Sequence, residues 1–158
     1  MKEKSYFILI ASKAYSRDDG WIASEEMVRR RLEAGQWGLY ENTPHKSAIA
    51  PGDVLLIYIA GAGRMKFIAS AEAGDVDFQA SNYQADGDAL TNPPAAVLHL
   101  ENTNAFPKPL PISELRDKLD FIPKNTARWG AVLQRGAKKI SASDAEVVLR
   151  SACVNPEA

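Results

Sequence analysis

A run of nine mostly apolar residues, Val54 to Ala62, most constrains what this chain can fold into. The dipeptide Pro51-Gly52, which is typical of a tight turn, comes shortly before the run, and glycines lie at its end. Nine residues are too few to cross a membrane, so the run predicts a central, buried strand. Residues 65–74 read as a second strand, and the glycines between the two predict a hairpin.

Other segments complete an α+β pattern. Residues 5–12 and 95–102 read as strands. A helix is expected from Ser24, which can act as its cap, with acidic residues in the first turn and Gly35 as the stop. Shorter helices are expected within 109–119 and 140–152. Strands joined by hairpins predict a small mixed, mostly antiparallel sheet or barrel with short helices packed around it.

Composition sets bounds on the class of protein. The 158 residues fit one domain spanning 1–158, and 46% hydrophobic with 25% charged residues is ordinary for a globular protein. The net charge is −1, but residues 1–70 carry +2, residues 71–122 carry −6 and residues 123–158 carry +3. If the two termini fold side by side, one face is mildly basic. This distribution permits a nucleic-acid-binding face without requiring one.

Several chemistries have no support in the sequence. Cys153 is the single cysteine, and His45 and His99 lack metal-ligand spacing, so no disulfide, metal or cofactor is expected. The apolar run near the N-terminus is too short for a signal sequence, which predicts a cytoplasmic protein without a membrane segment. Ser12, His45 and Asp53 could be named as a hydrolytic triad, but no local signature supports one. We therefore expect a protein that is not an enzyme.

The segment 36–46, QWGLYENTPHK, raises the question of what an indole does among polar residues. Tryptophan is large and mostly apolar, so Trp37 either closes the core from its edge or forms the wall of a pocket. Gly38 beside it would let a ligand approach the backbone. Both interpretations remain open from the residues alone.

Two long stretches resemble the EVE domain, a member of the PUA-like superfamily that also includes YTH and ASCH domains. The first is WGLYENTPHKSAIAPGDVLLIYIAGAGRMKFIASAEA, with its Trp-Gly pair, a lysine, a Pro-Gly-Asp turn, a strand containing tyrosine and a glycine hairpin. The second is PLPISELRDKLDFIPKNTARWGAVLQRGAKKISASDAEVV, with a short helix, a tryptophan, an L-x-R-G motif and a closing helix. The resemblance runs from about residue 5 to 150.

This resemblance implies a small barrel with a pocket at one end that holds a base taken out of its stack. It implies that Trp37 aligns with a wall of an aromatic cage and that Ser12 lies at the pocket floor. It also places Lys46 at a recurring basic position. The alternatives are a core plug for Trp37, simple strand termination for Ser12 and a solvated side chain for Lys46.

Further candidates come from the residues themselves. Tyr58 and Trp129 could border the pocket, against a core or rim role for each. Phosphate contacts could come from the basic side chains of the first helix and of the hairpin, although arginines paired with glutamates usually form a solvated face. These candidates are Arg29, Arg30, Arg64 and Lys66.

The expected function is that of a nucleic-acid-binding module that reads a modified or flipped-out base, modified cytosine or similar, in DNA or RNA. The resemblance also makes a restriction or modification enzyme a candidate partner. The alternative is a module that binds a small molecule or nucleotide metabolite in the same pocket.

Overall fold

The computed structural model describes residues 4–16, 20–39, 48–61, 64–78, 94–122 and 136–152. The main strands are β1 (Tyr6–Ala11), β4 (Gln36–Leu39), β5 (Val54–Ile59), β6 (Lys66–Asp77), β7 (Ala96–Pro111) and β8 (Ala137–Ile140). Two short strands, β2 (Ala14–Ser16) and β3 (Gly20–Ile22), pair separately. The helices are α1 (Ser24–Ala34), α2 (Ala142–Ala152) and the 3₁₀ turn η2 (Ile112–Glu114).

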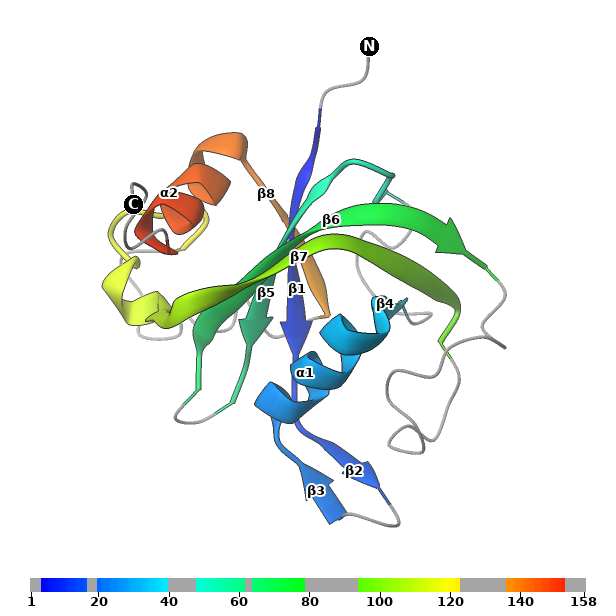
Figure 1. The fold of residues 1–158 in the computed structure, drawn as a ribbon. Coiled ribbons are helices and arrows are strands. Elements are labelled where there is room, and N and C mark those ends of the chain that lie inside the picture. Colours follow the sequence, from blue (N-terminus) through cyan, green and yellow to red (C-terminus); the bar gives the residue numbers. More distant parts are fainter. Residues whose placement is uncertain are drawn as a thin grey trace.

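The main strands form one curled sheet in the order β4-β7-β6-β5-β1-β8. The pair β1–β5 is parallel, and the other four pairings in this sheet are antiparallel. Figure 1 shows β6 and β7 sweeping across the sheet as long curved strands. The α+β class, the mixed and mostly antiparallel sheet and the β5–β6 hairpin are therefore confirmed, with the described strands forming half of a barrel.

The central strands β1 and β5 are buried on both faces, which explains why their sequences are continuously apolar rather than alternating. Side chains such as Phe7 and Leu55 point into one core, to which α1 contributes Val28. Their neighbours, such as Ile8 and Leu56, join a second core with residues of α2. Figure 1 shows α1 beside β4 and α2 near β8. The two helices thus cover the two faces of the same strands.

Helix α1 begins and ends close to the expected positions, but it is not capped as expected. The N-cap residue is Ala23, which has no side chain that could accept a hydrogen bond, and Ser24 is the first helical residue. The expectation that Ser24 caps the helix is therefore wrong. At the other end Gly35 adopts φ 67°, and its N–H meets the carbonyls of Arg31 and Leu32. Only glycine takes this left-handed conformation without strain, so the helix stops there.

The first four residues of the segment that raised the question about Trp37 form the strand β4. β4 pairs with β7, with Trp37 opposite Leu98 and Gly38 opposite Val97. The sequence did not predict this strand because four residues beside a glycine carry too little pattern to distinguish a strand from a loop. The location of β4 at the sheet edge brings Trp37 into the first core.

Candidate functional site

The parallel pairing of β1 and β5 creates one edge of the sheet where two strands end together. Ala11 is in register with Ile59, and the N–H of Ala60 donates to the Ala11 carbonyl at 2.9 Å. Ser12 and Ala60 therefore leave the sheet at the same place. From Ser12 the chain continues through the β2–β3 hairpin and returns as α1, so the first turn of this helix also comes to this edge. The topology alone thus gathers the ends of β1 and β5, the β2–β3 hairpin and the start of α1 there.

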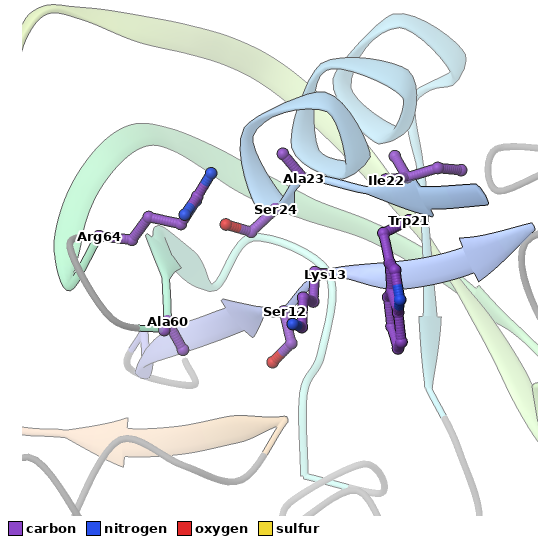
Figure 2. A pocket seen from close by; sticks show the side chains of 9 residues that line it. Ser12, Lys13, Trp21, Ile22, Ala23, Ser24, Ala60 and Arg64 are labelled. Carbon is purple, nitrogen blue, oxygen red and sulfur yellow. The ribbon is translucent and has the colours of Figure 1, made fainter. Parts of the chain in front are cut away.

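A pocket of about 450 Å³ lies at this edge. This volume is within the usual range for small-ligand sites. Its lining residues come from the ends of β1 and β5, from β3, from the start of α1 and from the residues before β6 (Figure 2): Ser12, Lys13, Trp21, Ile22, Ala23, Ser24, Ala60, Gly61 and Arg64.

Trp21 gives the pocket an aromatic wall. Its side chain is 65% exposed, which is unusual for an indole, and it projects from β3 beside the pocket (Figure 2). The Lys13 Nζ lies 4.7 Å from its ring centroid, and the ring of Tyr15 meets it edge-on with centroids 5.4 Å apart. Tyr15 and Trp21 are direct partners across the β2–β3 pair. This pairing holds the indole in place while leaving much of its surface to solvent.

Arg64 supplies a second cation at the pocket. Its Nε donates to Glu25 Oε1 at 2.8 Å, which ties the segment before β6 to the first turn of α1. The hydrogen bond from Arg64 lowers the pKa of Glu25, assisted by the charges of Arg64 and Lys66 and opposed by partial burial. Glu25 is therefore ionised at neutral pH. Arg29 pairs instead with Glu26 and Glu33 on its own helix.

The structure brings only part of the predicted site together. Ser12 and Arg64 line the pocket. Trp37 does not line it: the side chain is 3% exposed and belongs to the first core, which is the alternative that the sequence left open. Gly38 is buried beside it in β4. The roles of these residues toward a base stay predictions, and the burial of Trp37 and Gly38 gives theirs no support.

Tyr58 also lies in a core. It is 1% exposed, and its ring meets Phe67 edge-on with centroids 5.2 Å apart. Burial raises the pKa of Tyr58 to about 12. The sequence left a core role open for Tyr58, and this geometry matches it.

The remaining predicted contact residues lie on α1, on β6 or outside the described residues. Arg29 and Arg30 hold Glu26 at 2.6 and 3.1 Å, as expected of a solvated face of charged pairs. Lys66 is half-buried at the start of β6. It pairs with Ile59, the residue directly before the pocket residue Ala60. Lys46 and Trp129 lie outside the described residues. Phosphate binding by any of these side chains stays a prediction.

Two of the residues named for a hydrolytic triad, Ser12 and Asp53, are far apart. Asp53 precedes β5 and Ser12 lies at the opposite end of the β1–β5 pair, so the six residues of β5 separate them by about 20 Å. The Asp53 carboxylate instead accepts hydrogen bonds from the N–H groups of Ser5 and Ala50, at 3.0 and 2.9 Å. Asp53 is therefore a structural residue. His45 lies outside the described residues.

Two other features are absent from the described ranges, a metal-ligand cluster and a membrane-spanning helix. No group of three or more potential metal ligands occurs among these residues. None of the helices described here is long and apolar enough to span a membrane.

The sequence singled out Trp37 and not Trp21, the tryptophan that lines this pocket. Trp21 stands directly after the turn-forming residues SRDDG, and the position of an aromatic residue beside a turn is an available signal for an exposed ring. Lys13 and Ser24 carried no such signal, because a lysine after a strand and a serine before a helix are commonplace. Their position at one pocket follows from the pairing of β1 with β5.

No family model and no curated protein matches the chain, but solved structures do. The human THYN1 protein, in complex with DNA containing 5-methylcytosine, has a TM-score of 0.62 at 10% identity, over 94% of this chain and 98% of that chain. The YTH domain of Zygosaccharomyces rouxii MRB1, in complex with N6-methyladenosine RNA, has a TM-score of 0.58 at 11% identity, over 96% and 88%. The N-terminal domain of Staphylothermus marinus McrB has a TM-score of 0.58 at 8% identity, over 92% and 93%. At these identities the similarity shows a shared fold.

Proposed function

We propose that this chain, which has the PUA-like fold of EVE and YTH domains, binds nucleic acid and holds one modified or flipped-out base in the pocket at the ends of β1 and β5. The observation that carries the proposal is Trp21, an exposed indole on the wall of a 450 Å³ pocket with two cations beside it. Two proteins of the same fold have structures in complex with a methylated nucleic acid, THYN1 with DNA containing 5-methylcytosine and the YTH domain with N6-methyladenosine RNA. These complexes support a modified base as the ligand.

Trp21 would act as a stacking surface. A base stacked on an aromatic side chain gains about 1–3 kcal/mol, with little preference among bases. Lys13 lies over the ring, but an exposed cation–π contact contributes only about 0.5–1 kcal/mol. A base can therefore displace the ammonium group, which then becomes available to a phosphate or to an oxygen on the base.

Selectivity would come from hydrogen bonds to the base edge. Ser12 lies on the pocket lining with an exposed hydroxyl that can donate or accept. The backbone at Ala60 and Gly61 borders the same space and offers further polar groups. Extruding a base from a duplex costs a few kcal/mol, so single-stranded or mismatched ligands should bind best. No catalytic role is proposed for these residues, and a partnership with a restriction or modification enzyme stays a prediction.

The test compares two exposed aromatic residues. Trp21→Ala and Phe78→Ala each remove a side chain that is 65% exposed, but Phe78 follows β6 and does not line the pocket. The ligands are single-stranded oligonucleotides that carry one 5-methylcytosine in DNA or one N6-methyladenosine in RNA, each with its unmethylated counterpart. Trp21→Ala should weaken binding of the preferred oligonucleotide about 10- to 100-fold, as expected from the loss of one stack.

Phe78→Ala should leave this affinity unchanged. Equal affinities for wild type and Trp21→Ala would refute the proposal. The small-molecule alternative has its own signature: a free nucleoside would bind as tightly as the oligonucleotide, and the affinity would not depend on salt.

A further inference from the structure

Ser24 is a buried polar side chain without a partner. It is 0% exposed, and its Oγ has no hydrogen-bond partner among the described residues. Because buried hydroxyl groups are almost always hydrogen-bonded in folded proteins, an orphan of this kind needs an explanation. The usual role of a serine at the start of a helix does not provide one, since Ala23 is the N-cap and no side chain caps this helix.

The Ser24 side chain is directed into the pocket. Ser24 lines the pocket together with Ser12, Ala60 and Arg64. Figure 2 shows its hydroxyl oxygen turned toward the space bounded by Arg64 and Ala60, with the end of the Arg64 side chain close to the first turn of α1. A ligand atom in this part of the pocket would be the missing partner of the hydroxyl.

The surroundings of Ser24 favour an oxygen that carries negative charge. The first intrahelical bond runs from Met27 N to Ala23 O, so the N–H groups of residues 24–26 precede the bonded part of α1. Such N–H groups and the helix dipole attract anions, and α1 has eleven residues. Arg64 adds a full positive charge, and Lys13 a second on the same pocket. Glu25 is the one acidic residue in contact with Arg64 among the described residues, and it engages Nε alone.

We infer that the Ser24 end of this pocket is a subsite for an oxyanion, held by the Ser24 hydroxyl, the first turn of α1 and Arg64. The inference rests on the proposed function for its ligand, which would present either a phosphate of the strand or a carboxylate on the base. Both groups carry at least two charged oxygens, so one oxygen can accept a hydrogen bond from the Ser24 hydroxyl while another accepts from the Arg64 guanidinium. The subsite thus defines the class of nucleotide that the pocket accepts.

The subsite can be tested without a base. Inorganic phosphate is added to the full chain at constant ionic strength, and amide chemical shifts are followed by NMR. Saturable shifts are expected at residues 24–27. Ser24→Ala and Arg64→Gln should each weaken this phosphate binding about 10-fold, the effect of losing one charge-assisted hydrogen bond. Arg150→Gln removes the same charge from an exposed site on α2, outside the pocket, and should leave phosphate binding unchanged.

Stability provides a second readout. Because the Ser24 hydroxyl has no partner, Ser24→Ala should keep or raise the melting temperature while it weakens phosphate binding. A lower melting temperature with unchanged phosphate binding would make Ser24 a structural residue and overturn the inference. Shifts that do not saturate, or that persist unchanged in both pocket variants, would overturn it as well.

Two pairs of ligands identify the source of the oxyanion. Cytidine is compared with cytidine 5′-monophosphate, and with cytidine that carries a carboxyl group on C5. Tighter binding of the monophosphate assigns the subsite to a strand phosphate, and tighter binding of the carboxyl compound assigns it to the base; no gain from either overturns the inference. The proposed function fails separately, when Trp21→Ala leaves oligonucleotide affinity unchanged, and the phosphate titration remains decisive for the subsite in that case.

Discussion

Arg31 lies over the ring of Trp37, with its Cζ 4.6 Å from the ring centroid. Both side chains are nearly buried, at 8% and 3% exposed, and Trp37 packs among the residues of the first core. The guanidinium thus covers one face of the indole that a base would need for stacking. The contact adds a partner from α1 to an indole that the pairing of β4 with β7 has already brought into the core.

Trp37→Ala should therefore reduce stability rather than act on binding alone. Removing a buried tryptophan typically costs about 3–5 kcal/mol of unfolding free energy. Denaturant unfolding of Trp37→Ala beside Trp21→Ala measures the contrast, because the exposed Trp21 should cost little stability. A Trp37→Ala protein as stable as wild type, but unable to bind oligonucleotides, would restore Trp37 as a pocket wall.

Lys13→Gln should change how oligonucleotide binding depends on salt. Once a base displaces the Lys13 ammonium from Trp21, this cation is free to contact a phosphate. Each phosphate contact contributes about 0.7 to the slope of log K against log salt for a single strand, so the slope should fall by about that amount. Lys139→Gln is the matched control, since Lys139 is an exposed lysine on β8 that does not line the pocket. Equal slopes for Lys13→Gln and wild type would exclude a phosphate contact by Lys13.

Asp53→Ala should lower stability and leave ligand binding unchanged. The substitution removes the acceptor of two backbone hydrogen bonds, from Ser5 and Ala50. Hydrogen bonds to a charged group contribute more than neutral ones, so the expected loss is about 2 kcal/mol of unfolding free energy. Chemical denaturation and oligonucleotide titration of the same variant provide both readouts. A loss of affinity without a loss of stability would point to a direct role for Asp53 at the pocket.

Ionisation of the buried Tyr58 hydroxyl should make the protein less stable in alkaline solution. Burial raises the pKa of Tyr58 to about 12, from an ordinary value of 10.0. Between these values the unfolded chain releases the hydroxyl proton while the folded chain retains it, so the free energy of unfolding falls as the pH rises. Over this range the loss should reach about 2 kcal/mol. Below the ordinary pKa both states are protonated, and the effect disappears.

The measurement is chemical denaturation of wild type and Tyr58→Phe at about pH 9 and about pH 11. Tyr58→Phe should lose less stability than wild type between the two values, because it lacks the titrating hydroxyl. Tyr15→Phe, at an exposed tyrosine, is the matched control. If Tyr58→Phe and wild type lose the same stability, ionisation of Tyr58 does not destabilise the fold.

Local signals predicted β1, β5 and α1 closely, but β7 was expected only over 95–102 and continues to Pro111, and the short helix expected within 109–119 is the 3₁₀ turn η2. The apolar runs of β1 and β5 and the acidic first turn and glycine stop of α1 are each encoded within a few neighbouring residues. The short strands β2, β3, β4 and β8 were not predicted, since three or four residues carry no measurable period. The start of α2 was also closely predicted, and the Ser141 hydroxyl accepts a hydrogen bond from the Asp144 N–H there.

The candidate site was predicted only in part for a different reason. Ser12 and Arg64 were named and do line the pocket, whereas Trp37 was chosen in place of Trp21. Trp21 and Trp37 each stand beside a glycine and near turn-forming residues, so the turn before Trp21 was not enough to separate the two. Their exposures of 3% and 65% differ because one enters the sheet as a strand paired with β7 and the other lies on a hairpin outside it.

The sequence by itself determined which segments are apolar, where α1 stops and that the chain resembles the EVE domain, because each of these is written in adjacent residues. The tertiary structure decided which side chains meet. The parallel pairing of β1 with β5 joins Ser12, Trp21, Ser24 and Arg64 at one pocket, although they lie up to 52 positions apart in the chain. Such a meeting depends on long-range strand pairing, and no local pattern of residues specifies it.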